Sequence, residues 1–330
     1  MDRFKPGSRK GAGMISDQAG MRQLTTLDGG GILLHGTYHK PQSLAGNEAA
    51  VSTTTLGIMF TNALSSPRSL VGDSGVYWAT SFASLGYPSF RFDFPGLGDS
   101  YGEIPNDLLR FTNQGGYAAV ASSKARELVQ KYQLSGVVMF GHCSGGTTAI
   151  YGASSCKECK GLVLLDPDLT LPRALTVTLQ PGLVLWIRRS RAGAILRATY
   201  DRVRALKTIL GKGDLPPGTN FDVINRFKEV VSRGTPILVL KAPETAISGG
   251  AGKADSLDYF EYIRSFAVRS DQISIRTIED TDHSFSNHAG QLAVRQHTEK
   301  WLSENFAEGV ASIAPVQQQE SQIQAPLISR

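Results

Sequence analysis

The sequence of 330 residues has no run of about 18 or more apolar residues, the length that marks a membrane-spanning helix. Residues 1–20 are basic but lack the apolar core of a secretory signal, so we expect a flexible leader there. The chain also has no internal repeat. These absences leave an ordinary globular composition, in which 41% of the residues are apolar and 19% are charged.

Cysteine is scarce, with three residues in the whole chain: Cys143, Cys156 and Cys159. Few cysteines without a secretion signal indicate a reducing compartment, so we expect a cytoplasmic protein. Cys156 and Cys159 form a CxxC pair, but a single further cysteine cannot complete a four-sulfur zinc site. We therefore expect a surface turn at this pair, and neither a metal nor a cofactor.

Short apolar runs alternate with amphipathic segments along much of the chain. Strands are expected at 22–28, 31–38, 55–63, 88–94, 136–141, 161–166, 236–242 and 272–279, and helices at 76–87, 115–133, 257–268 and 289–306. The first two strands should form a hairpin. This alternation predicts an α/β fold, with a mostly parallel sheet that helices cover on both faces.

The alternation stops between about 170 and 234, where the sequence is mostly helical and basic, and this predicts an inserted helical cap. One domain is expected over 21–306. Residues 307–330 are rich in Gln, Ser, Ala and Pro and are expected to form a disordered tail, because they could bury little apolar surface.

The stretch GHCSG (141–145) follows an apolar strand and opens a helix, which is the setting of a nucleophile elbow. The turn is sharp, so the residues two before and two after the nucleophile must be small. For Cys143 these residues are Gly141 and Gly145, whereas for Ser144 one of them would be His142, which would clash. Cys143 is therefore the predicted nucleophile, at a helix N-terminus that favours the thiolate.

The remaining parts of an acyl-transfer site can be assigned from their positions relative to the strands. The backbone N–H of Ser144 and one near Asn62 or Ala63 are expected to bind the oxyanion. His283, between the last strand and the last helix, is the predicted base, with His288 as the second choice. His142 should point away from the pocket.

The acid that orients the histidine has several candidates. Glu244 follows the 236–242 strand and ranks first, and Asp166, at the end of the 161–166 strand, ranks second. Asp168 and Asp255 are also within reach. A separate pair of carboxylates, Asp93 and Asp99, is expected to brace turns through backbone N–H groups rather than to catalyse.

Three stretches carry a resemblance to a known family: GYPSFRFDFPGLGDSYG (86–102), GHCSGG (141–146) and DHSFS (282–286). With these motifs the sequence resembles the α/β-hydrolase superfamily, over roughly 50–170 and 235–306. Within it, the chain is similar to serine-aminopeptidase-like (S33-type) hydrolases, and especially to bacterial ones encoded beside exosortase and exopolysaccharide systems, which often carry a Gly-x-Cys elbow. The resemblance implies hydrolysis or acyl transfer.

Two departures from this pattern leave a second interpretation open. The relatives carry Gly-Pro-x-Arg after the third strand, whereas this chain has Gly72-Asp73-Ser74-Gly75, and the acid position is irregular. Dienelactone hydrolase, another member of the superfamily, works with a Cys–His–Asp triad, so a cysteine is compatible with activity. We expect an ester or thioester hydrolase or acyltransferase, with a peptidase less favoured. The alternative is an inactive binding module, which a carboxylate within hydrogen-bonding distance of His283 would disfavour.

The net charge of +5 is concentrated in the predicted cap. Between 173 and 212 there are nine basic residues and one acid, or +8, which leaves 5 − 8 = −3 for the rest of the chain. Three interpretations remain: a solvated helix that covers the site, a site for an anionic acyl substrate, or contact with a membrane surface. Nucleic acid is not expected, because no motif that reads it accompanies the charge.

Overall fold

The structure is a computed structural model, and it describes residues 21–28, 31–41, 55–62, 64, 66–170, 219–243 and 259–306. The predicted leader, the predicted tail and the basic segment of the predicted cap lie outside these residues. So does Glu244, the first candidate for the acid.

The described elements alternate between strand and helix, as expected. The strands are β1 (Arg22–Asp28), β2 (Leu33–His39), β3 (Leu56–Thr61), β4 (Ser89–Phe92), β5 (Gly136–His142), β6 (Cys159–Leu165), β7 (Ile237–Lys241) and β8 (Ile273–Thr277). The helices are α2 (Ser74–Ser84), α3 (Leu108–Asn113), α4 (Ala118–Tyr132), α5 (Ser144–Ser154), α8 (Phe221–Ser232), α9 (Tyr259–Arg264) and α10 (His288–Asn305), with a 3-10 turn, η2, at Val71–Asp73.

The eight strands form one sheet in the order β1-β2-β4-β3-β5-β6-β7-β8. The β1–β2 hairpin is antiparallel, as predicted, and β2 is also antiparallel to β4. All the other neighbouring pairs are parallel. The carboxyl ends of β3 to β8 therefore meet along one edge of the sheet, which is where a doubly wound fold places its ligands.

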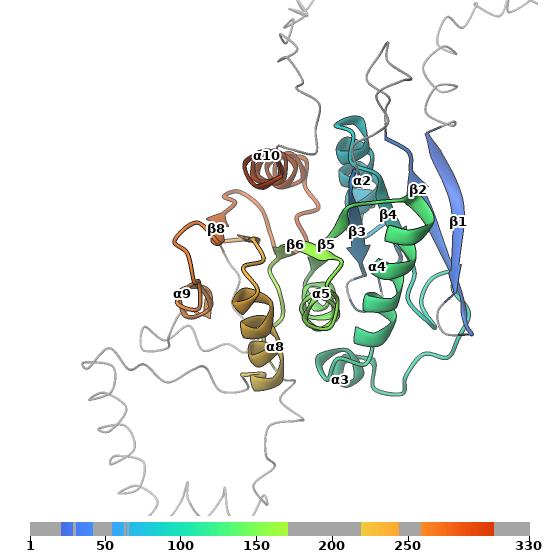
Figure 1. Cartoon of the computed structure of the whole chain (residues 1–330), viewed down its shortest axis with the longest axis horizontal. Coiled ribbons are helices and arrows are strands. Elements are labelled where there is room, and N and C mark those ends of the chain that lie inside the picture. The colour runs from blue at the N-terminus through green and yellow to red at the C-terminus, as the bar shows by residue number, and fades with distance from the viewer. Residues whose placement is uncertain are drawn as a thin grey trace, which may run out of the picture.

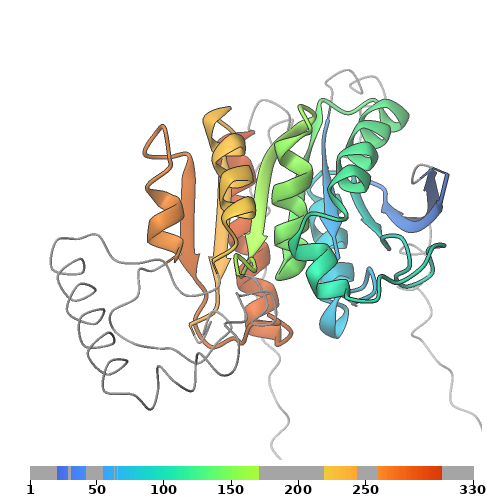
Figure 2. The same cartoon turned by 90° about the horizontal axis from the view of Figure 1, so that it is seen from below.

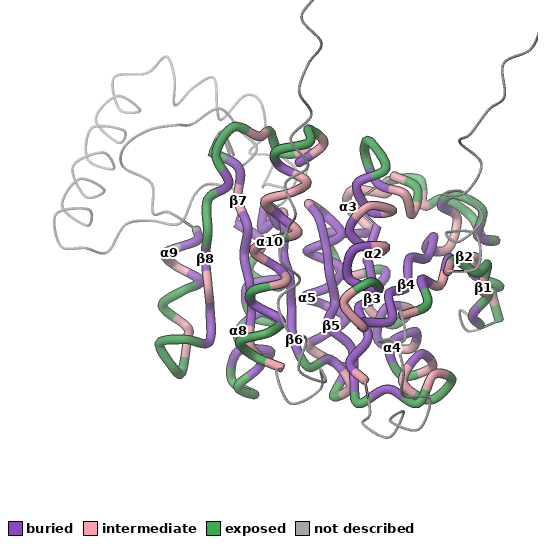
Figure 3. The backbone as a smooth tube through the Cα atoms, turned by 90° about the horizontal axis from the view of Figure 1, so that it is seen from above, coloured by how far each residue is buried: buried purple, intermediate pink, exposed green. Residues whose placement is uncertain are grey.

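Helices cover both faces of this sheet (Figures 1 and 2). Helices α2 and α10 lie on one face, and α4, α5, α8 and α9 lie on the other. The central strands are buried on both sides, as Figure 3 shows. Alternate residues of β5 serve the two cores: Val138 and Phe140 pack on the α2 side, and Val137 and Met139 pack on the α5 side. This explains why the central strands are continuous apolar runs rather than alternating ones.

Two elements differ from the sequence expectations. Helix α3 was not expected, and Asp107 caps it by accepting a hydrogen bond from the backbone N–H of Arg110 at 2.9 Å. Helix α8 falls inside the range predicted for the cap, yet its buried face packs beside α5 in the layer over the sheet. The basic segment begins after Thr170 and ends before Thr219, and these two residues are antiparallel bridge partners.

Among the described residues, none of the helices combines the length and apolar character that crossing a bilayer requires.

Candidate active site

Cys143 sits on a sharp turn between β5 and α5. Its backbone has φ 53° and ψ −123°, a conformation that residues other than glycine rarely adopt. The turn is held on both sides: the N–H of Cys143 donates to the carbonyl of Leu165 at 2.8 Å, and its own carbonyl accepts from the N–H of Gly146 at 2.9 Å. Strain of this kind at a strand-to-helix turn is typical of a nucleophile elbow.

The two glycines around Cys143 have no room for a side chain. A Cβ on Gly141 would lie 2.5 Å from the carbonyl oxygen of Gly145, and a Cβ on Gly145 would lie 2.6 Å from the carbonyl oxygen of Asn62. Both obstacles are backbone atoms, which cannot swing aside as the end of a side chain can. The steric rule by which the sequence selected Cys143 over Ser144 therefore holds in the structure.

The three thiols differ in exposure. Cys143 is partly exposed, whereas Cys156 and Cys159 are buried in the core beneath α5. The expectation of a surface turn at the CxxC pair is therefore wrong for the cysteines themselves, because the turn exposes Lys157 and points both thiols inward. Burial raises the pKa of Cys156, and it raises that of Cys159 to about 12. Cys143 is thus the one thiol placed to react with a solute.

His283 lies at the same edge of the sheet, in the loop between β8 and α10. Its Nδ1 is 3.2 Å from Oδ2 of Asp166, and its side chain is 49% exposed. The hydrogen bond to Asp166, followed by one to Cys143, raises the pKa of His283 to about 10. The imidazole therefore carries a proton at neutral pH. Cys143, His283 and Asp166 are called the thiol cluster below.

Asp166 is the acid that the structure brings to His283. It follows β6 directly, its side chain is fully buried, and its carboxylate accepts from the backbone N–H of Ala242 at 3.3 Å. The pairing of Leu165 with Leu240 aligns the ends of β6 and β7, so an acid after either strand can reach the same point. Glu244 follows β7 and lies outside the described residues, as does Asp255. Asp168 instead accepts from the N–H and hydroxyl of Thr170.

The residues predicted to bind an oxyanion lie beside Cys143. Ser144 opens α5, so its backbone N–H is among the first-turn donors that have no partner within the helix. The hydroxyl of Ser144 is buried and accepts from the N–H of Leu64 at 2.6 Å. The side-chain amide of Asn62 is engaged elsewhere, because its Nδ2 donates to the carbonyl of Ser66 at 3.0 Å.

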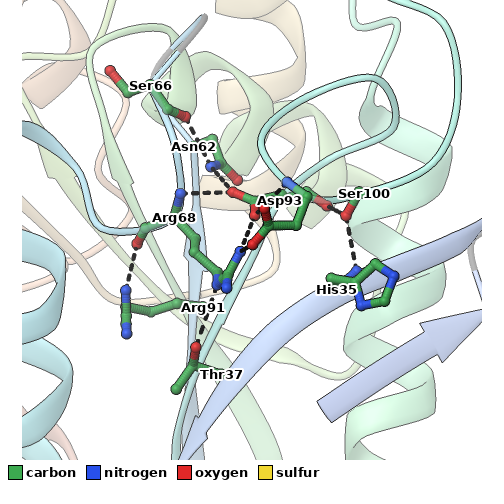
Figure 4. A network of polar contacts seen from close by, with 9 residues as sticks. His35, Thr37, Asn62, Ser66, Arg68, Arg91, Asp93 and Ser100 are labelled. Carbon is green, nitrogen blue, oxygen red and sulfur yellow. Dashed lines mark hydrogen bonds and ion pairs between the residues drawn. The ribbon is translucent and has the colours of Figure 1, made fainter. Parts of the chain in front are cut away.

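A second polar cluster lies at the end of β4 (Figure 4). The buried carboxylate of Asp93 accepts from the backbone N–H of Arg68 at 2.7 Å and from that of Asp99 at 3.2 Å, and it also pairs with the Arg68 guanidinium. Asp93 thus braces turns through backbone N–H groups, as expected, whereas the exposed carboxylate of Asp99 accepts from the Arg68 guanidinium at 2.7 Å instead. Arg68, in the loop after β3, is the arginine that this network holds.

The same cluster continues toward β2. The guanidinium of Arg91 donates to the carbonyl of Arg68 and to Nε2 of His39, both at 2.9 Å. Both side chains are buried; burial lowers the pKa of His39 to about 3 and that of Arg91 to about 10. His39 is therefore neutral at pH 7, and its role is structural. Asp93, Arg68, Arg91, His39 and Asn62 are called the bracing network below.

His142 has a role that the sequence did not suggest. It is buried beside the thiol cluster, and its Nε2 lies 2.6 Å from the backbone carbonyl of His283. Burial lowers the pKa of His142 to about 4, so the ring is neutral at pH 7. Because a carbonyl oxygen can only accept, Nε2 carries the proton and donates it.

Within the described part of the chain, His, Cys, Asp and Glu side chains do not gather in groups of three or more that could hold a metal ion.

Comparisons with known proteins agree on the fold. Residues 32–295 match the Alpha/beta hydrolase family. The fold is similar to that of DcsB, solved in complex with its substrate analogue, with a TM-score of 0.55 and 15% identity over 86% of this chain and 99% of that one. No curated protein matches the sequence.

Two further solved structures share the fold. The dienelactone hydrolase of Anabaena variabilis aligns with a TM-score of 0.53 and 15% identity, over 86% of this chain and 99% of that chain. An esterase of Pyrococcus furiosus aligns with a TM-score of 0.54 and 14% identity, over 92% and 98%. With the predicted α/β sheet confirmed and most of its length matched, the chain belongs to the alpha/beta hydrolase family.

Proposed function

We propose that this protein hydrolyses esters or thioesters, or transfers their acyl groups, with Cys143 as the nucleophile. The observation that carries the proposal is the thiol cluster itself. A partly exposed thiol on a strained elbow contacts a histidine, and that histidine is hydrogen-bonded to the buried carboxylate of Asp166 at 3.2 Å.

The chemistry divides into two steps. The thiol proton of Cys143 resides on His283, and the deprotonated sulfur attacks the carbonyl carbon. The carbonyl electron pair moves to oxygen, where the N–H of Ser144 and one from the loop after β3 stabilise it. The intermediate collapses to an acyl-thioester, and the leaving alcohol or thiol takes the proton from His283. Water, or an acceptor alcohol in acyl transfer, then gives a proton to His283 and displaces the sulfur of Cys143.

Asp166 holds His283 by its Nδ1, which directs Nε2 toward the thiol and stabilises the imidazolium. We place Asp166 rather than Glu244 in this role because of the contact between Asp166 and His283. A thiol nucleophile suits esters and thioesters better than amides, so a peptidase is less favoured. The narrower resemblance to S33-type and exopolysaccharide-associated hydrolases rests on the RFD, GDS and Gly-x-Cys stretches.

The alternative of an inactive binding module rested on the irregular acid and the missing arginine. Asp166 stands within hydrogen-bonding distance of His283, and this contact disfavours the binding module. An anionic acyl group remains our proposal for the substrate, on the charge of residues 173–212.

The test is turnover of short-chain p-nitrophenyl esters and acyl-CoA thioesters by the full chain. We expect Cys143→Ala and His283→Ala each to lower kcat/KM by about 10³-fold or more, as removal of triad members does. Cys156→Ala is the matched control and should retain the wild-type rate, because that thiol is buried away from the site. Undiminished turnover in Cys143→Ala would overturn the proposal. So would an inactive wild type whose Cys143 is alkylated no faster than the two buried thiols.

A further inference from the structure

The residues on either side of Cys143 each hold one of the loops that complete the site. His142 contacts the loop that carries the base, and Ser144 contacts the loop that follows β3. We propose that His142 and Ser144 are positioning residues: His142 fixes His283, and Ser144 fixes the oxyanion-binding loop. This inference rests on the proposed function and assigns separate tasks within the same site.

The contact from His142 reaches the backbone of the base itself. Its Nε2–H donates to the carbonyl of His283 at 2.6 Å, and the two ring centroids are 5.1 Å apart. Phe285, which is fully buried, packs against the His142 ring with the two ring planes at 83° and the centroids 6.0 Å apart. The loop is therefore tied to the end of β5 by a hydrogen bond and by packing. This tie leaves the His283 side chain free to face Asp166 and Cys143.

The charge state of His142 suits this task. A neutral ring donates to the carbonyl without placing a second positive charge beside the protonated His283. The other ionisable groups that act on His142 are His283, Asp166 and Asp282, and burial outweighs all of them in keeping the ring neutral.

The contact from Ser144 fixes a different loop. Its hydroxyl accepts from the N–H of Leu64, whose φ of 33° lies in the left-handed region that residues other than glycine rarely adopt. Thr61 adds a second tie, because its hydroxyl donates to the carbonyl of Gly145 at 2.8 Å. The N–H of Leu64 is thereby occupied by the hydroxyl of Ser144 and is not the donor that the loop would offer to an oxyanion.

The burial of Ser144 also bears on its own chemistry. The residue is 1% exposed and its hydroxyl oxygen accepts from Leu64, so Ser144 is badly placed to act as a nucleophile. By its position in the sequence, the Ser144 hydroxyl is an alternative nucleophile to Cys143. In the structure it instead holds the loop after β3 through Leu64.

The test compares two substitutions by two readouts. The first readout is kcat on a p-nitrophenyl ester, which needs both the base and the oxyanion-binding loop. The second is the rate of Cys143 alkylation by iodoacetamide at pH 6 relative to pH 9. This ratio depends on the His283 partner, but it needs no oxyanion donor, because alkylation occurs at a saturated carbon.

We expect a crossed pattern. Ser144→Ala should lower kcat about tenfold and leave the alkylation ratio at the wild-type value. His142→Phe should lower kcat by a similar factor and also lower the alkylation ratio, because His283 no longer holds its position. His142→Gln supplies an amide N–H in place of the imidazole and should restore most of both. The matched controls are Ser155→Ala, at the end of α5, and His297→Phe, on α10; both should behave as wild type.

The inference is overturned if the two variants match their controls. It is also overturned if they lose both readouts in proportion to a fall in thermal stability, which would indicate general loosening of the domain. Wild-type turnover that survives Cys143→Ala would instead remove the proposed function. In that case the alkylation ratio of His142→Phe, compared with wild type, still tests the hydrogen bond from His142 to His283, because alkylation requires no turnover.

Discussion

The thiol cluster and the bracing network both contain a buried carboxylate that directly follows a strand, Asp166 after β6 and Asp93 near the end of β4, but the two clusters differ in how exposed their other members are. In the bracing network, Asp93 and Arg91 are buried. Asp93 pairs with the guanidinium and the backbone N–H of Arg68, and Arg91 donates to the imidazole of His39. In the thiol cluster, Asp166 is equally buried, but the chain of contacts ends at a partly exposed thiol. The thiol cluster can therefore react with a solute, because the residue at the end of its chain of contacts, Cys143, is partly exposed.

The contrast extends to the backbone. The thiol cluster is built on a strained residue, Cys143, which places its side chain outside the regular packing of β5 and α5. The bracing network uses a carboxylate to gather the N–H groups of turns, which is a common way to close a loop. One arrangement stabilises the fold, and the other uses the stability of the fold to hold a reactive group.

The largest effect should come from breaking the bracing network. Asp93→Ala removes the partner of Arg68 and the acceptor of the turn N–H groups, so we expect the free energy of unfolding to fall by about 3–5 kcal/mol. Urea denaturation measures this loss. Asp99→Ala is the control: its side chain is 70% exposed, so stability should hardly change. If both substitutions lowered the free energy of unfolding equally, the burial of Asp93 would not explain its contribution to stability.

The second largest effect is expected in the thiol cluster, on activity rather than on stability. Asp166→Asn keeps the shape of the side chain but removes the charge that stabilises imidazolium, so we expect kcat/KM to fall about 10²-fold, or ~2.7 kcal/mol. Ester turnover measures it. Asp168→Asn, two residues along, should retain the wild-type rate. An unaffected Asp166→Asn variant would return the role of the acid to Glu244.

The two clusters should also give stability opposite dependences on pH. His283 has its pKa raised from 6.5 to about 10, so its contribution is complete below pH 6.5 and is lost as the pH rises toward 10. His39 has its pKa lowered from 6.5 to about 3, so its contribution is complete above pH 6.5 and is lost as the pH falls toward 3. Denaturation across pH 3–10 measures both limbs.

Substitution assigns each limb to its cluster. Asp166→Asn should flatten the part of the alkaline limb below pH 9 and leave the acid limb nearly unchanged, because the buried thiols of Cys156 and Cys159 also contribute above pH 9. His39→Gln, whose amide can still accept from Arg91, should flatten part of the acid limb alone, because buried His142 also contributes there. A single substitution that flattened both limbs equally would contradict the separation of the two clusters.

The smallest effect is expected in the core beneath α5. Cys156→Ala removes a buried sulfur that touches neither cluster, so the free energy of unfolding should fall by about 1 kcal/mol with unchanged turnover. Thiol titration should show that iodoacetamide labels Cys143 in the native protein and the other two cysteines after unfolding. Labelling of Cys156 or Cys159 at a rate similar to Cys143 would show that the core opens far more readily than its burial implies.

Much of the fold follows from local pattern. Continuous apolar runs such as 136–141 become the central strands β5 and β6 because such runs can be buried on both faces of a sheet. Helix α3 escaped prediction because it has six residues, too few for a clear periodic signal, and depends on its cap. The CxxC pair was misplaced for a related reason: spacing does not show which side of a turn faces the core.

The sequence by itself determined the elbow, because the need for small residues around a sharp turn is local and Gly141 and Gly145 satisfy it only for Cys143. It also located His283 through its position between a strand and a helix. Only the tertiary structure shows that Asp166 meets His283, since the end of β6 and the loop after β8 are far apart in the sequence and come together in the fold. It also decided that His142, Ser144 and Arg68 hold loops, because those contacts join segments that no local pattern connects.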